Sequence, residues 1–178
     1  MTFLETEDYI LRPLDVADVD GEYQYWLNDR EVVQYNSHGR FPKTKPSIIA
    51  YINAVNNNTS NLVLAIVDKK NYAHIGNISL QNINWVDRNA EIAFLLGNKD
   101  YWSKGVMLEV GKKIIEHGFS TLNLHRIYCG TSSANIGMQK LAVKLGMQLE
   151  GRRREAIFKD GHYFDVLEYG ILRLEYPK

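Results

Sequence analysis

An apolar segment from Ala90 to Gly97 is followed by a short turn with a glycine and by an amphipathic helix expected to end near Phe119. The turn, residues 101–107, reads Tyr-Trp-Ser-Lys-Gly-Val-Met. The first N–H groups of a helix have no partner within it, and the helix dipole adds roughly half a positive charge there. A strand, a turn and a helix start therefore predict an α/β fold with a phosphate or pyrophosphate site, to which Lys104 adds charge. The alternative is a surface helix capped by Ser103.

The glycine spacing excludes the two common nucleotide-binding loops. A P-loop needs two glycines flanking four residues, then Lys and Ser or Thr, but Gly97 and Gly105 are too far apart. The dinucleotide fingerprint needs three glycines at fixed spacing, and the turn supplies only Gly105. A phosphate site here must use another arrangement of backbone N–H groups.

Composition limits the other classes of function. The 178 residues predict a single domain covering 1–178. The sequence is compatible with a monomer and with a homodimer. Lys+Arg and Asp+Glu are equal at 21 each, so we expect neither nucleic acid nor an anionic membrane as a partner. The apolar run Leu62–Val67 is too short to span a bilayer, and Met1–Asp8 lacks the basic start of a signal peptide. The single cysteine, Cys129, suits a cytoplasmic location, and the scattered histidines indicate no metal site.

The spacing of apolar residues divides the chain into strands, with a period of two, and helices, with a period near 3.6. Strands are expected at Tyr9–Leu14, Leu62–Val67, His74–Ile83, Ala90–Leu96, His125–Ser132, Met147–Phe158 and Tyr163–Leu174. Helices are expected at Val16–Leu27 with Asp15 as cap, at Lys45–Asn56 with Thr44 as cap, at Ser103–Phe119 and at Asn135–Leu145. This order implies an α/β fold with a mixed central sheet of about six to seven strands and helices on both faces.

Several short motifs occur in a fixed order along the chain. They are Leu11-Arg12-Pro13-Leu14, Ala90-Glu91-Ile92, Asp100-Tyr101-Trp102 followed by Lys104-Gly105, the set Asn135, Leu141, Lys144 and Gly146, and Lys159-Asp160-Gly161. Together they resemble the GNAT superfamily of acetyl-CoA-dependent N-acetyltransferases, in particular the branch that includes the ribosomal-protein N-terminal acetyltransferases. The resemblance covers nearly the whole chain.

The resemblance implies that acetyl-CoA is the co-substrate, with no metal. The pyrophosphate of the coenzyme is expected on the turn and helix start, at Trp102, Ser103, Lys104, Gly105, Val106 and Met107. The pantetheine arm is expected to pair with Phe94, Leu95 and Leu96, between two parallel strands that separate. Asn135 resembles the side chain that hydrogen-bonds the coenzyme, and its alternative role is a helix N-cap.

Three positions depart from the family pattern. Met107 stands where a small residue is usual, so it either narrows the phosphate site or points into the core. Met138 and Ala142 replace a small polar residue and a tyrosine, so both usual donors of a proton to the departing thiolate are missing. The thiol pKa near ~8.5 allows water to supply that proton.

Acetyl transfer to an amine needs a base, because a primary amine is mostly protonated at neutral pH. Glu91 is the candidate, acting through a water, and its alternative is a structural carboxylate. The amine acceptor is expected to contact Tyr35, His38, Arg40, Phe41 and Tyr163. It is either a protein N-terminus or a small amine. The segment Tyr25–Asp29 is also similar to acetyltransferases of nucleotide-linked amino sugars, and a catalytically silent acyl-CoA-binding module is the alternative from another class.

Overall fold

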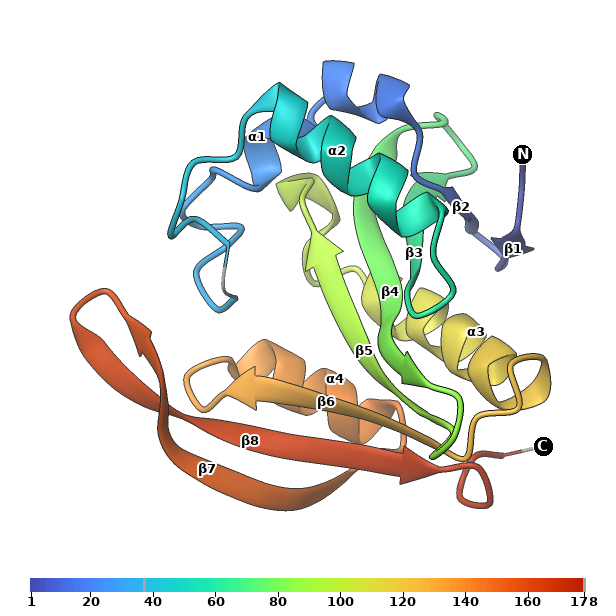
Figure 1. Ribbon diagram of the computed structural model, residues 1–178, viewed down its shortest axis with the longest axis vertical. Helices are drawn as coiled ribbons and strands as arrows, with labels where there is room; N and C mark the ends of the chain where they lie inside the picture. The colour runs from blue at the N-terminus through green and yellow to red at the C-terminus, as the bar shows by residue number, and fades with distance from the viewer. Residues whose placement is uncertain (37, 178) are drawn as a thin grey trace.

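The computed structural model describes residues 1–36 and 38–177. An eight-stranded sheet has the order β1-β2-β3-β4-β5-β6-β8-β7, and β5 and β6 are its parallel pair (Figure 1). The strands are β1 (Leu4–Glu5), β2 (Tyr9–Pro13), β3 (Leu62–Asp68), β4 (His74–Asn84), β5 (Asn89–Leu96), β6 (Arg126–Ser132), β7 (Gln148–Lys159) and β8 (His162–Leu172). The helices are η1 (Val16–Asp20), α1 (Tyr23–Trp26), α2 (Lys45–Asn56), η2 (Lys99–Tyr101), α3 (Val106–Ser120) and α4 (Ile136–Lys144).

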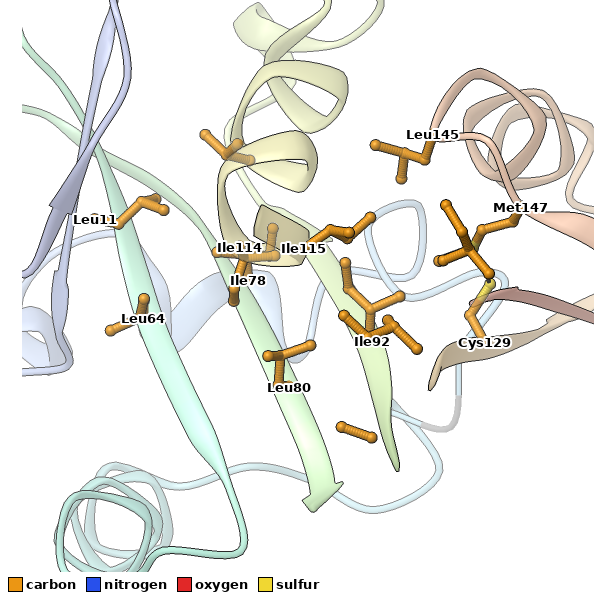
Figure 2. Packing of buried hydrophobic residues seen from close by; sticks show 14 of the residues in the cluster. Leu11, Leu64, Ile78, Leu80, Ile92, Ile114, Ile115, Cys129, Leu145 and Met147 are labelled. Carbon is orange, nitrogen blue, oxygen red and sulfur yellow. Dashed lines mark hydrogen bonds between the residues drawn. The ribbon is translucent and has the colours of Figure 1, made fainter. Parts of the chain in front are cut away.

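The sheet is covered on both faces, which confirms the predicted α/β architecture. Alternate residues of β3 explain why that strand is almost continuously apolar. Leu64 and Ile66 pack toward α3, whereas Val63 and Ala65 pack toward α1 and α2. Figure 2 shows the larger core, in which residues of α3 and of the strands meet. Within residues 1–36 and 38–177, no helix has the length and apolar character needed to cross a lipid bilayer.

Two expectations about the N-terminal half need correction. The sheet has one strand more than predicted, because the two-residue β1 pairs with β2 and is too short to leave a periodic pattern. The helix expected over 16–27 is two short pieces, η1 and α1, separated at Gly21, which adopts an extended conformation. Asp15 does cap η1, and Thr44 caps α2, as the sequence predicted.

The buried Asp18 carboxylate holds η1 against the sheet. Arg12 donates to it in a bidentate pair, with nitrogen to oxygen distances of 2.6 and 2.9 Å, and His74 Nδ1 lies 3.5 Å away. Burial alone would raise the pKa of Asp18, but the hydrogen bonds from Arg12, His74 and the Asp15 backbone outweigh burial and hold the pKa well below its usual range. The Leu11–Leu14 motif therefore has a structural reason, since Arg12 is half of this pair.

We expect Asp18→Asn to lower the free energy of unfolding by about 2 kcal/mol at neutral pH, because a charged hydrogen-bonded pair is lost. The folded-state pKa lies below the unfolded value of about 3.9, so the contribution of Asp18 is complete above that value and falls as the pH drops below it. Urea titrations at several pH values should show the gap between wild type and variant closing in acid. A gap that is constant with pH would contradict the assignment.

Candidate active site

The two parallel strands of the sheet separate along their length. β5 and β6 pair over Asn89–Glu91 and Arg126–Tyr128 and then diverge, as Figure 1 shows. A cavity of about 500 Å³ lies at the gap, lined by residues 92–96 of β5 and 129–132 of β6. Beyond Glu91 the facing edges of both strands leave backbone groups without a strand partner, which makes the gap suitable for an extended ligand arm.

Four of the predicted coenzyme contacts line this cavity: Phe94, Leu95, Leu96 and Asn135. The Asn135 side chain caps α4, and its Oδ1 accepts a hydrogen bond from the Met138 N–H at 3.0 Å. The amide nitrogen of Asn135 is the part of that side chain which a ligand can bind. The cap is confirmed, and the coenzyme contact stays a prediction.

The turn before α3 lies beyond the cavity and is fastened to its rim. Trp102 Nε1 donates to the carbonyl of Leu96 at 2.9 Å, so the turn follows the end of β5. The helix starts at Val106, later than expected, and Ser103 is not its cap. Ser103 and Gly105 have positive φ angles of 62° and 83°, a backbone reversal that aims the helix start.

The start of α3 keeps the features of an anion site. A Cβ placed on Gly105 would meet nothing within 4 Å, so the backbone there is open to a ligand. The side chains of Val106 and Met107 pack into the core, which settles the orientation of Met107 and leaves their N–H groups as the available contacts. Lys104 extends over the Tyr101 ring, with its Nζ 5.8 Å from the ring centroid.

Glu91 lies at the point where β5 and β6 part. It is the last residue of β5 that pairs with β6, opposite Tyr128, and its side chain lines the cavity. Asn82 Nδ2 donates to its Oε2 at 3.3 Å, which orients the carboxylate. Burial raises the pKa of the Cys129 thiol to about 12, and the negative charges of Glu91 and Glu168 add to this rise. Cys129 is therefore a neutral core thiol and not a nucleophile.

A row of polar side chains beside Glu91 was missed from the sequence. Asn77, Ser79 and Gln81 of β4 line the cavity, and Gln81 pairs in register with Glu91. Gln81 Nε2 donates to Ser79 Oγ at 2.9 Å, so the Ser79 hydroxyl hydrogen is left for a cavity partner. Alternation with the buried Ile78 and Leu80 was visible in the sequence, but such a pattern normally indicates a solvated face.

The predicted acceptor contacts divide into two groups. Tyr35, His38 and Arg40 line the cavity. Phe41 and Tyr163 lie on the surface, with 78% and 64% of their area exposed, and neither belongs to the cavity wall. Lys43, which lies in the same basic segment as Arg40, also lines the cavity. Lining residues that the sequence did not single out are Tyr23, Ser47, Tyr51, Thr131, Ser132 and Ile157.

The β7–β8 hairpin is fastened to the loop that carries the acceptor contacts. Lys159 Nζ donates to the carbonyls of Val33, Asn36 and His38 at 2.9, 3.2 and 3.4 Å. Arg40 Nη2 donates to the carbonyl of Phe158 at 3.2 Å. Hairpin and loop therefore form one wall of the cavity, although they are more than a hundred residues apart in the chain.

Trp26 fixes the N-terminal helices against the end of β5. It is buried, and a Cβ on Gly97 would overlap its indole ring.

We expect Gly97→Ala to lower the free energy of unfolding by about 1–3 kcal/mol, because the ring cannot move without disturbing the core beneath α2. Denaturant titration would measure this loss. Gly151→Ala is the control, since its Cβ would meet nothing within 4 Å, and equal losses in the two variants would contradict the proposed overlap.

The architecture and the cavity suit a transferase of the acyl-CoA-dependent class. Comparison with known proteins identifies the family. The Acetyltransferase (GNAT) domain family matches residues 8–148, so the chain belongs to the GNAT acetyltransferases. The resemblance inferred from the short motifs is confirmed. The protein is an acetyl-CoA-dependent N-acetyltransferase, and acetyl-CoA is its co-substrate. Among the described residues, no three His, Cys, Asp or Glu side chains gather in the way that a metal site requires.

Individual relatives support this assignment. The chain is 32% identical over 178 residues to an uncharacterized N-acetyltransferase, p20 of Bacillus licheniformis, covering 99% of each chain. It is 29% identical over 101 residues to the spermidine N(1)-acetyltransferase of Escherichia coli, covering 57% of this chain and 54% of that protein. The spermidine N-acetyltransferase of Vibrio cholerae, solved with CoA and spermine, has a similar fold, with a TM-score of 0.87 at 24% identity, covering 95% of this chain and 98% of that one.

Proposed function

We propose that the protein acetylates a small primary amine by direct attack of the amine on the thioester of acetyl-CoA. The observation that carries the proposal is the position of Glu91, at the point where β5 and β6 separate and inside the cavity. A base is needed there because the attacking nitrogen must lose a proton. The amine nitrogen bonds to the acetyl carbon, its proton passes to Glu91 through a water, and the carbon–sulfur bond breaks. The thiolate then takes a proton from water.

The residues around the cavity suit the other steps. A backbone N–H of β5 near Leu95 or Leu96 is the proposed partner of the developing oxyanion. The start of α3, with Gly105 and Lys104, is the proposed seat of the pyrophosphate. Neither Met138 nor the fully buried Ala142 can donate a proton to the thiolate, and water is the proposed donor.

A small amine is favoured over a protein N-terminus by the cavity itself. At about 500 Å³ it lies within the usual range for small-molecule sites. The relatives named as spermidine acetyltransferases also act on small amines by name. A protein N-terminus is the second candidate, favoured by a Bacillus subtilis relative, YdaF, whose name proposes ribosomal N-acetylation and which is 29% identical over 101 residues.

Release of free coenzyme A thiol in the presence of an amine panel tests the proposal. The panel should contain short peptides with free N-termini, simple alkyl amines and amino sugars. We expect thiol release with small amines and little with peptides. Robust acetylation of peptides, together with inertness toward every small amine, would overturn the small-amine acceptor and favour the second candidate.

A further inference from the structure

The ionised side chains around the cavity are unevenly distributed. Arg40 and Lys43 line its acceptor wall, and both are cations. Among the described residues that line the cavity, Glu91 is the single acid, and the proposed reaction already uses it as the base. The part of an acceptor that lies away from its reacting amine therefore meets positive charge.

Backbone contacts position the two residues that carry these cations. The Asn28 side chain binds the backbone of Lys43 on both sides, donating to its carbonyl and accepting from its N–H, each at 2.9 Å. Arg40 donates one of its N–H groups to the carbonyl of Phe158 at 3.2 Å. A guanidinium has five N–H groups, so Arg40 keeps donors for an anion. These contacts give a structural reason for the Asn28 of the Tyr25–Asp29 segment.

Positive charges also surround His38, which lies two residues before Arg40, and they affect the pKa of its side chain. Burial lowers the pKa of His38, and the ammonium groups of Lys43 and Lys159 lower it further. His38 is thus neutral at neutral pH and can act as a hydrogen-bond partner without adding charge. The Lys159 ammonium is occupied by three backbone carbonyls, which leaves Arg40 and Lys43 as the groups placed to bind a ligand anion.

We infer, on the basis of the acetyl transfer proposed above, that the acceptor is a primary amine whose far end carries a phosphate or carboxylate bound by Arg40 and Lys43. Guanidinium groups bind such oxyanions through paired, charge-assisted hydrogen bonds, and lysine adds a point charge. A polyamine is the opposite case, because its additional cations would lie beside Arg40 and Lys43 and meet no carboxylate other than Glu91 among the described lining residues. The charge of the cavity wall thus separates this protein from polyamine acetylation.

Three amines of equal chain length test the inference: 3-aminopropyl phosphate, 3-aminopropanol and 1,3-diaminopropane. They share a three-carbon chain with an amine at one end and carry an anionic, neutral or cationic group at the other, and the rate for the diamine is counted per amine. We expect kcat/KM from thiol release to be highest for the phosphate and lowest for the diamine, with steps of about tenfold or more. The advantage of the phosphate should shrink as salt is added, because exposed charges are screened. A diamine that equals or exceeds the phosphate would overturn the inference.

A double variant assigns the effect to the two residues. Arg40→Gln with Lys43→Gln removes both charges and keeps a polar side chain at each position. The ratio of phosphate to propanol activity should fall about tenfold or more. Lys45→Gln is the control, because Lys45 pairs with Asp20 at 3.2 Å and does not line the cavity. An unchanged ratio in the double variant, or an equal fall in the control, would overturn the assignment.

Binding separates failure of this inference from failure of the proposed function. Calorimetry of the same three amines with CoA-loaded protein ranks their affinities without turnover. If the phosphate binds tightest and no amine is acetylated, the anion contact at Arg40 and Lys43 stands and the proposed transfer falls. If amines are acetylated and the three affinities are equal, the transfer stands and the inference falls.

Discussion

Replacing Glu91 by glutamine is expected to lower kcat by roughly 10²- to 10⁴-fold and to leave the affinity for acetyl-CoA nearly unchanged. The reason is chemical, because the amide cannot accept the proton of the attacking amine. The amide oxygen can still accept the hydrogen bond from Asn82 that orients the carboxylate, so the local structure should persist. Steady-state kinetics and calorimetry measure the two effects, and the acidic limb of the pH–rate profile should weaken.

Glu168→Gln is the matched control for this result. Glu168 lies on β8, pairs with Arg153 at 2.7 Å and does not line the cavity. Both Glu91 and Glu168 raise the pKa of the Cys129 thiol, so the two carboxylates lie in the same neighbourhood. The two variants thus remove equivalent charges, and only Glu91→Gln should lose turnover. Wild-type turnover in Glu91→Gln would make Glu91 a structural carboxylate.

Gly105→Val is expected to weaken acetyl-CoA binding by about 100-fold, equivalent to about 2.7 kcal/mol. A branched side chain would occupy the open space in which a phosphate must approach the start of α3. It would also strain the backbone, because Gly105 has a φ of 83°. Calorimetric titration with acetyl-CoA measures the loss, and circular dichroism checks the fold.

A second substitution separates obstruction from strain. Asparagine tolerates a positive φ, so Gly105→Asn should fold normally and still weaken binding. Gly161 offers a matched control in the β7–β8 turn, with a φ of 82° and nothing within 4 Å of an added Cβ. Gly161→Asn should therefore leave acetyl-CoA affinity unchanged. Equal affinity in folded Gly105→Asn, Gly105→Val and wild type would remove the phosphate site from the start of α3.

The gap between β5 and β6 is the proposed site of acetyl-CoA, and the identity of the acceptor depends on the opposite wall. That wall is built from the loop before α2 and from the β7–β8 hairpin, joined through Lys159 and Arg40. Relatives named for spermidine acetylation share the fold, but a shared fold does not fix which side chains line a pocket. The proposed anionic acceptor therefore rests on the charges at Arg40 and Lys43.

The sequence by itself determined the features that depend on local pattern. Apolar spacing located β3 and α2 within a residue of their observed bounds, because each buries a regular face. Side chains that satisfy nearby backbone N–H groups also act locally, so the caps at Thr44 and Asn135 were predictable. The short motifs, read in order, identified the family and with it the co-substrate.

The tertiary structure alone decided how these elements form a cavity. Alternation in β4 shows that Asn77, Ser79 and Gln81 share one face, but only packing shows that this face looks into a cavity and not into solvent. The three carbonyls around Lys159 belong to residues more than 120 positions earlier in the chain. The separation of β5 from β6 likewise depends on where β8 and α4 hold β6. Such contacts join residues distant in sequence, and local periodicity carries no information about them.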